Sequence, residues 1–239
     1  MNVIKLFCFP YGGGSATIYF DWKQYIDRSI ELHPVELAAR GRRMHESNYD
    51  SVNDAVEDVF NIIKSDLVNG PYALFGHSLG SMIAFELAYK IKREKLPYPI
   101  HIFFAGRGAP HTAWHEEKKY YKLPEEEFRK EVMVLGGIPK EFLEEPELLD
   151  IIFTLLRGDY QIAETYSYVE KDAPLDCGIT LLNATNDEAS REDIDAWKVH
   201  AGKECNIHYF EGDHFFLREE TEKILDIINA TLSNVNPNR

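Results

Sequence analysis

The sequence is poor in the features that mark metal, disulfide or nucleotide sites. Its 239 residues contain three cysteines, Cys8, Cys177 and Cys205, an odd number without the spacing of a metal site. We therefore expect buried or incidental thiols in a reducing compartment. The glycine-rich stretch that begins at Gly12 matches neither the P-loop nor the dinucleotide-binding spacing, so no metal or other cofactor is expected.

Long apolar runs and positive charge are also scarce. The first apolar run, Val3–Phe9, meets Pro10 at once and is too short for a signal-peptide core. No run approaches the roughly 20 apolar residues of a membrane span. The 26 Lys and Arg against 40 Asp and Glu give a net charge of −14, which argues against a nucleic-acid partner. We expect a cytoplasmic, monomeric globular protein that binds neither membranes nor nucleic acid.

The most informative stretch runs from Tyr72 to Glu94. An apolar run, Tyr72–Phe75, leads into Gly76-His77-Ser78-Leu79-Gly80, and a helical spacing of apolar residues follows at Leu79, Met82, Ile83, Leu87 and Ile91. In this strand, turn and helix context, Gly-x-Ser-x-Gly predicts a nucleophile elbow that exposes Ser78. The alternative is a tight turn in which Ser78 only caps the helix.

Strand and helix patterns alternate along the rest of the chain. Five more strands are predicted, at Val3–Phe9, Leu32–Ala38, Ile100–Ala105, Ile179–Thr185 and Asn206–Phe210. Helices are expected at 16–28, from Asp50 or Ser51 to Leu67, at 191–201 and up to Leu232. This alternation predicts one α/β domain over residues 1–239, with a mostly parallel central sheet and helices on both faces.

A helical insertion interrupts the alternation over residues 111–171. Its predicted helices are Pro124–Leu135, Pro139–Glu145 and Pro146–Tyr168. Because the insertion follows a strand, it should lie above the carboxyl edge of the sheet, which is where a lid would cover an active site. An extra helical layer that does not move fits the same pattern.

A serine nucleophile requires a histidine base and a carboxylate, which follow the serine in this fold in the order acid, then histidine. His200 falls in a predicted helix and His208 in a strand, which leaves His214, in a loop just past a strand, as the base. Asp187 follows a strand in the same way and is the predicted acid, with Glu188 as the fallback.

Two further stretches lie at strand ends. The loop Gly12–Gly14 is suited to supplying an oxyanion-hole N–H, although it equally fits a flexible turn. The cluster Arg40, Arg42 and Arg43 stands out in so acidic a chain and would suit a phosphate or phosphodiester. Surface pairing of these arginines with Glu46, Asp50 or Asp54 is the alternative.

Beyond these motifs, nearly the whole chain resembles the stand-alone type II thioesterases of nonribosomal peptide and polyketide synthetases, of the α/β-hydrolase superfamily. Several of the matching motifs fall in the predicted lid, outside what hydrolases in general share. The matching stretches are residues 9–16, the elbow 76–80, 106–110, 135–139, 156–160, 164–166 and 212–217.

The resemblance implies Ser78 as nucleophile, Asp187 as acid and His214 as base, with the backbone N–H groups of Leu79 and Gly12 as oxyanion donors. The implied reaction is hydrolysis of acyl or aminoacyl thioesters on the phosphopantetheine arm of carrier proteins, which clears misprimed or stalled units. We add the hypothesis that Arg40, Arg42 and Arg43, with Arg107, receive the phosphopantetheine phosphate or the carrier.

The sequence departs from the family pattern at three positions. The family usually has Ala at Gly12 and Gly at Ala184 and Asp213, and a carboxylate beside His214 could alter its pKa or the turn geometry. Two other functions remain open. One is a general carboxylesterase or lipase-like serine hydrolase for small free esters, and the other is a catalytically idle carrier-binding protein.

Overall fold

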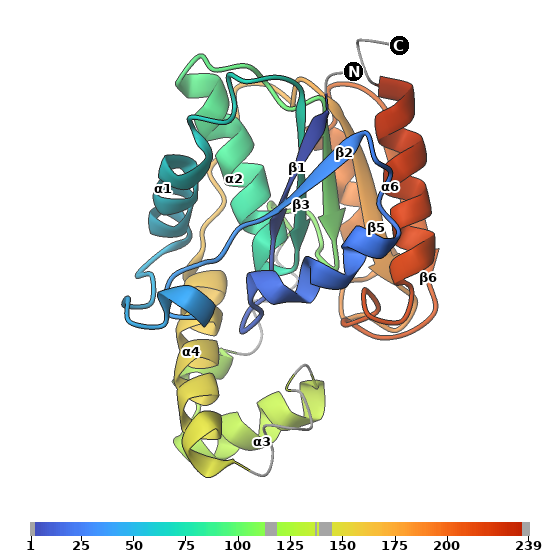
Figure 1. Ribbon diagram of the computed structural model, residues 1–239. Helices are drawn as coiled ribbons and strands as arrows, with labels where there is room; N and C mark the ends of the chain where they lie inside the picture. Colours follow the sequence, from blue (N-terminus) through green and yellow to red (C-terminus); the bar gives the residue numbers. More distant parts are fainter. Residues whose placement is uncertain (1–2, 113–118, 137, 139–144, 236–239) are drawn as a thin grey trace.

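Six strands form one sheet in the computed structural model, which describes residues 3–112, 119–136, 138 and 145–235. The strand order is β2-β1-β3-β4-β5-β6, and every neighbouring pair is parallel (Figure 1). This confirms the predicted parallel sheet. The strands are β1 (Ile4–Phe9), β2 (Ile30–Pro34), β3 (Tyr72–His77), β4 (His101–Ala105), β5 (Gly178–Ala184) and β6 (Cys205–Phe210).

Helices cover both faces of the sheet, as predicted. One face packs against α1 and α2, and the other against α6 and the 3-10 helix η1 (Figure 1). Alternate side chains of β1 pack into the cores on the two sides of the sheet, because successive residues of a strand point to opposite faces. The α-helices are α1 (Val52–Ile63), α2 (Leu79–Arg93), α3 (Glu125–Leu135), α4 (Pro146–Thr165), α5 (Arg191–Asp195) and α6 (Thr221–Val235), and the 3-10 helices are η1 (Ala16–Gln24), η2 (Gly41–Arg43), η3 (Tyr120–Lys122) and η5 (Ala196–His200).

Three predicted elements differ from those observed. The expected helix 16–28 is the shorter η1, whose buried residues Ala16, Tyr19 and Trp22 recur every three positions. That spacing lines up along a 3-10 helix but drifts around an α-helix, which explains the difference. The expected strand Leu32–Ala38 instead ends at Pro34, which has no N–H for the ladder and is tolerated because β2 is an edge strand. The helix expected over 191–201 divides into α5 and η5.

The predicted insertion forms α3, α4 and η3 at the carboxyl edge of the sheet (Figure 1). It has a small core of its own, built from Phe128, Val132, Phe153 and Leu156. The helix predicted over 139–145 lies outside the described residues except for Glu145. Among the described helices, none is both long and apolar enough to cross a membrane.

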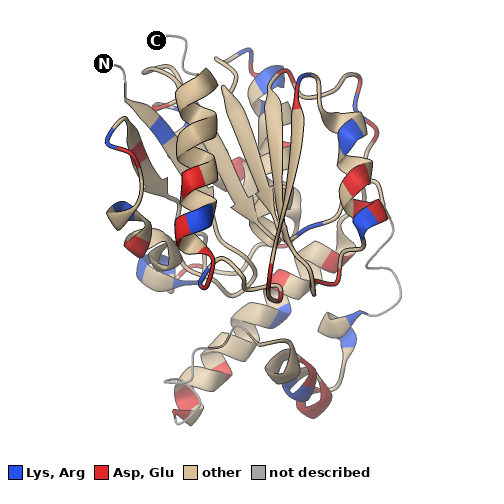
Figure 2. Ribbon diagram, turned by 90° about the vertical axis from the view of Figure 1, so that its right-hand side faces the viewer, with Lys and Arg blue, Asp and Glu red and all other residues tan. Residues whose placement is uncertain are grey.

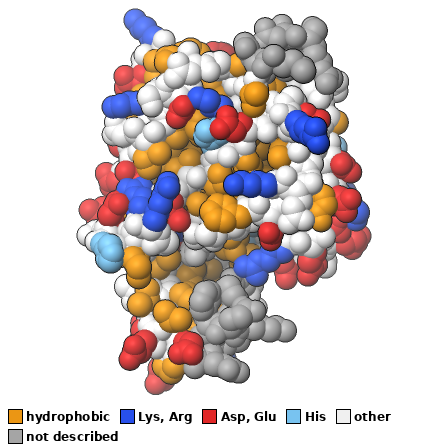
Figure 3. Space-filling view, in the orientation of Figure 1, with side chains coloured by type: hydrophobic (Ala, Val, Ile, Leu, Met, Phe, Trp, Pro, Cys, Tyr) orange, Lys and Arg blue, Asp and Glu red, His pale blue; other side chains and the backbone are white. Residues whose placement is uncertain are grey.

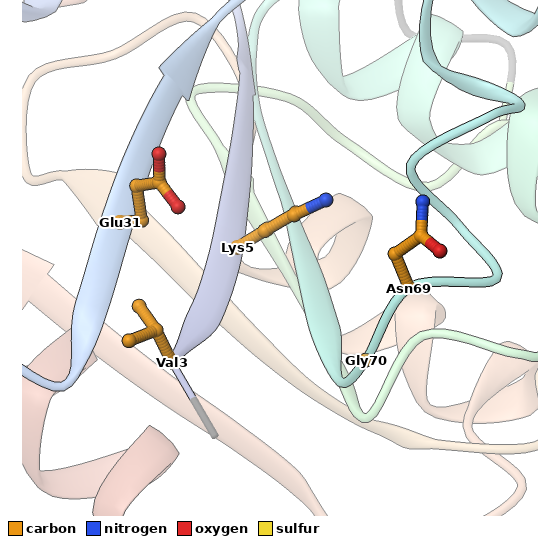
Figure 4. Close-up of a pocket in the computed structure, with 5 residues that line it drawn as sticks. All are labelled: Val3, Lys5, Glu31, Asn69 and Gly70. Atoms are coloured by element: carbon orange, nitrogen blue, oxygen red, sulfur yellow. The ribbon is translucent and has the colours of Figure 1, made fainter. Parts of the chain in front are cut away.

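Charged residues lie mostly on the helices and loops around the sheet (Figure 2). At the amino edge of the sheet, Lys5 extends from β1 between Glu31 and Asn69 in a shallow pocket (Figure 4). Its ammonium group lies 2.6 Å from the Asp66 carboxylate. This edge is opposite the carboxyl ends of the strands, where ligands bind in open α/β sheets.

Buried histidines should make the fold sensitive to acid. Burial lowers the pKa of His101 from 6.5 to about 4, and burial together with His111 and Lys171 lowers the pKa of His200 to about 4. Below pH 6.5 these histidines bind protons in the unfolded chain but stay neutral in the folded chain. Their contribution to stability is therefore complete above pH 6.5 and is lost as the pH falls toward 4. Between pH 6.5 and 5 we expect His101 to cost about 2 kcal/mol of unfolding free energy, measured by urea titration, and His200 to lower stability in the same direction.

The variant His101→Gln should remove the share of this pH dependence that His101 contributes. Equal pH dependence in wild type and His101→Gln would contradict the assignment.

Candidate active site

The predicted elbow joins β3 to α2, with Ser78 between them. Ser78 has φ 53° and ψ −111°, a strained conformation for a residue other than glycine. A Cβ atom on Gly76 would overlap the carbonyl of Gly80, and a Cβ on Gly80 would overlap the carbonyl of Phe9, so both positions require glycine. The Ser78 side chain makes no capping hydrogen bond to α2. The alternative role of Ser78 as a helix cap is therefore wrong.

Asp187 and His214 come together from the ends of β5 and β6. The Nδ1 of His214 lies 2.9 Å from Oδ1 of Asp187, whose side chain is 1% exposed. Burial acts to raise the pKa of Asp187, but hydrogen bonds from His214 and the backbone N–H of Glu188 outweigh it and hold the pKa below its usual value. The carboxylate is therefore ionised and can hold Nδ1 of His214 in its protonated form.

A second histidine supports this pair, and sequence analysis missed it. His77, the residue before Ser78, is fully buried, and its Nε2 lies 2.9 Å from the carbonyl oxygen of His214. Burial, together with the charge of His214, lowers the pKa of His77 to about 3, so it is a neutral imidazole that donates from Nε2 to that carbonyl. His77 thus ties the elbow to the loop of the predicted base.

One cavity of about 510 Å³ brings the predicted residues together. Its floor includes Ser78, Leu79, Asp187 and His214, with the loop Gly12–Gly14 beside them. Apolar side chains gather over α4 in the lower left part of Figure 3. The insertion contributes the cavity's apolar wall, which includes Val132, Leu135, Ile138, Ile152, Leu156, Tyr160 and Ala163. This arrangement suits an apolar acyl group beside a serine nucleophile.

Comparison with known proteins assigns the family. The sequence profile of the family described as Thioesterase domain matches residues 4–232. The chain belongs to this family.

Relatives resemble this thioesterase over nearly its whole length. The linear gramicidin dehydrogenase LgrE of Brevibacillus parabrevis is 36% identical over 233 residues, which are 96% of this chain and 88% of LgrE. The crystal structure of ClbQ, from the colibactin NRPS/PKS pathway, superposes with a TM-score of 0.93 at 32% identity and covers 98% of both chains. The type II thioesterase YbtT, from the yersiniabactin NRPS/PKS pathway, superposes with a TM-score of 0.85 at 26% identity and covers 98% of this chain and 95% of its own.

The four arginines of the thioesterase have different surroundings. Arg40 is only 4% exposed and pairs with Asp159 of α4, so it is not available to a carrier or a phosphate, and that part of the prediction is wrong. Arg40 is unavailable because its three guanidinium nitrogens all donate hydrogen bonds to acceptors within the protein. Sequence analysis missed Asp159, which sits in a lid helix far along the chain.

The other three arginines lie nearer the surface. Arg43 bonds Glu46, as the alternative predicted, and also Asp58. Arg42 is exposed in η2, in the segment that follows β2. Arg107 lines the cavity, and burial lowers its pKa to about 10, so its guanidinium stays charged at neutral pH.

The departure at Asp213 has a local explanation. Its carboxylate accepts the backbone N–H of Phe215 at 2.8 Å, which caps the turn that carries His214. An aspartate can thus shape this turn by a side-chain bond where the family usually has a glycine.

Proposed function

We propose that this thioesterase hydrolyses acyl or aminoacyl thioesters held on the phosphopantetheine arm of carrier proteins and thereby clears misprimed or stalled units from nonribosomal peptide or polyketide assembly. The observation that carries the proposal is the Asp187–His214 pair beside the strained Ser78 in one cavity. Likeness to ClbQ and YbtT over the full chain supports the substrate class. LgrE is named a dehydrogenase, but a serine with this acid and base favours hydrolysis.

The roles of the residues follow from this geometry. His214 takes the proton of Ser78 while the serine oxygen attacks the thioester carbonyl, and Asp187 stabilises the imidazolium that forms. The backbone N–H groups of Leu79 and Gly12 stabilise the negative oxygen of the tetrahedral intermediate. The C–S bond then breaks, and His214 returns the proton to the leaving thiolate.

Hydrolysis of the acyl-enzyme repeats these steps with water. His214 removes a proton from water, and the hydroxide adds to the ester carbonyl of the acylated Ser78. The bond between the carbonyl carbon and the Ser78 oxygen then breaks, and His214 returns the proton to that oxygen, which releases the acid and the free serine. We assign residues 1–239 to one α/β-hydrolase domain, in which the insertion 111–171 acts as a lid over this cavity.

The carrier is proposed to approach Arg42 and Arg107. Arg42 is exposed beyond β2, and Arg107 lies in the cavity wall, where a phosphodiester at the entrance would find a charged guanidinium. We expect the enzyme to act as a monomer in the cytoplasm, which its free thiols suit.

Time-resolved intact mass of a carrier protein loaded with short acyl groups tests the proposal. Wild type should remove the acyl group from the carrier faster than it cleaves a matched free ester, and Ser78→Ala serves as the inactive control. A carrier that stays loaded while the ester is cleaved would establish the general esterase instead. If the carrier stays loaded and the ester stays intact, the protein would be the catalytically idle carrier-binding protein.

Replacing Arg42 with alanine should weaken carrier recognition. We expect kcat/KM for the loaded carrier to fall by up to about fivefold at low salt, the effect of one exposed ion pair worth about 1 kcal/mol. The dependence of kcat/KM on salt should become shallower. Arg28, exposed two residues before β2 at the amino edge, is the matched control, and Arg28→Ala should behave as wild type. Identical salt slopes for the two variants would exclude the Arg42 contact.

A further inference from the structure

A buried carboxylate of the lid reaches the proposed oxyanion loop. Asp159, on α4, accepts the backbone N–H of Gly13 at 2.6 Å with its Oδ2. Both oxygens of Asp159 also accept from Arg40, each at 2.8 Å. The two charged residues are 3% and 4% exposed. The lid helix is thus bonded to the residue next to Gly12, the proposed oxyanion donor.

The bonded N–H belongs to a turn that has two possible orientations. Gly14 donates to the carbonyl of Tyr11 at 2.9 Å, which closes a four-residue turn with Gly12 and Gly13 at its centre. Gly13 has φ 79°, the value of the third residue of a type II turn. With glycine at both central positions, the peptide between them is free to flip to the type I form. A flip would exchange the Gly13 N–H for the Gly12 carbonyl beside the cavity.

Asp159 selects one of these orientations. A carboxylate accepts hydrogen bonds and repels a carbonyl oxygen, so it favours the form with the Gly13 N–H turned toward α4. Arg40 fixes the carboxylate in turn, because its Nε and Nη1 also donate to the carbonyls of Ala38 and Gly14. The side chain of Leu156, one turn earlier on α4, fills the space above Gly13.

We propose that Asp159, held by Arg40, is a positioning residue that anchors the Tyr11–Gly14 turn through the Gly13 N–H. The Gly12 N–H belongs to the preceding Tyr11–Gly12 peptide, and anchoring the turn keeps that peptide in place for oxyanion stabilisation. This inference rests on the proposed role of the Gly12 N–H. It also requires α4 to stay in place for the loop to be correctly formed.

Two variants separate positioning from stability. Removing one partner of a buried ion pair leaves an unpaired charge, whereas replacing both by apolar residues of similar size is often neutral for stability. Arg40→Met leaves Asp159 able to accept the Gly13 N–H. It should therefore lower the melting temperature clearly but change kcat little. Arg40→Met combined with Asp159→Leu should regain stability but leave Gly13 without its acceptor.

For the double variant we expect kcat to fall by about 10²- to 10³-fold with little change in KM, the effect of losing one oxyanion donor. The rate of fluorophosphonate labelling of Ser78 should fall in parallel, because that reaction also places an oxygen in the oxyanion hole. Asp159→Asn keeps an acceptor for the Gly13 N–H. If its melting temperature equals that of Asp159→Leu, it should still retain more activity than Asp159→Leu. It serves as the test should the double variant not fold.

Wild-type labelling and activity distinguish a failure of the proposed function from a failure of the positioning role of Asp159. A wild-type enzyme that is neither labelled nor active on loaded carrier would remove the proposed function itself. Wild-type labelling with an unchanged rate in the folded double variant, or activity that follows melting temperature across all variants including Asp159→Asn, would overturn the positioning role alone.

Discussion

Replacing Ser78 with alanine should lower kcat for thioester hydrolysis by about 10⁴- to 10⁶-fold, the loss seen when a serine nucleophile is removed. The hydroxyl of Ser78 is the proposed attacking group. Ser78 lies at the N-terminus of α2 and lines a cavity that His214 also lines. Labelling by a fluorophosphonate should disappear together with hydrolysis. Both are measured on the purified protein, by loaded-carrier mass and by gel fluorescence.

Ser81 provides a matched control three residues further on. Its hydroxyl is buried and bonds the carbonyls of Gly76 and Ala105 at 2.8 and 3.0 Å. Ser81→Ala should cost about 1 kcal/mol of stability per lost hydrogen bond and still be labelled. Labelling that persists in Ser78→Ala would place the nucleophile elsewhere.

The backbone at Ser78 gives the same experiment a stability readout. A residue with a Cβ atom at φ 53° stores strain, which Ser78→Ala retains and Ser78→Gly relieves. Ser78→Gly should therefore be inactive yet more stable than Ser78→Ala by about 1 kcal/mol. Equal stability of the two variants would mean that the elbow is not strained.

The elbow was predictable because its causes are local. A strand pattern, two glycines around a serine and a helical pattern lie within about 20 residues. Gly76 is required by contacts within the turn itself, whereas Gly80 is required by the close approach of Phe9 on β1. The parallel sheet was predictable for a similar reason, since alternating strand and helix patterns leave few topologies. Asp187 and His214 followed from their places after strands, and the structure brings them into contact.

The partners of the arginines were not predictable because they depend on long-range packing. Three arginines within four positions look equivalent in sequence, yet one is buried, one is shared between two carboxylates and one is exposed. Arg40 meets a carboxylate 119 positions away. The stretch 156–160 matches the family pattern but assigns Asp159 no task, because a single acidic residue on a helix usually faces solvent.

His77 was missed for a related reason. Its position between Gly76 and Ser78 is variable in the elbow motif, so the motif assigns it no task. Its bond to the His214 carbonyl arises only when β3 and the loop after β6 come together. The chemistry of the cavity floor was thus predictable, whereas the groups that orient it were not.

Replacing Asp187 with asparagine should lower kcat by about 10⁴-fold with little change in KM, as expected when a triad histidine loses its orienting carboxylate. Oδ1 of Asp187 accepts from both His214 and the Glu188 backbone, so an asparagine that keeps the backbone bond has no charge to stabilise the imidazolium. Because the pKa of Asp187 is lowered, its carboxylate stays ionised in the wild-type enzyme at weakly acidic pH. The loss of kcat in Asp187→Asn should therefore persist across that range. Steady-state kinetics between pH 5 and 9 measure it.

Glu188→Gln is the control for this experiment, because Glu188 lines the same cavity and follows the same strand. It should retain nearly wild-type kcat, since the Nδ1 of His214 contacts Asp187. The reverse result, an active Asp187→Asn and an inactive Glu188→Gln, would make Glu188 the acid. If both single variants keep kcat, neither carboxylate orients the base, and the loop bond from His77 to His214 would be the remaining candidate for that task.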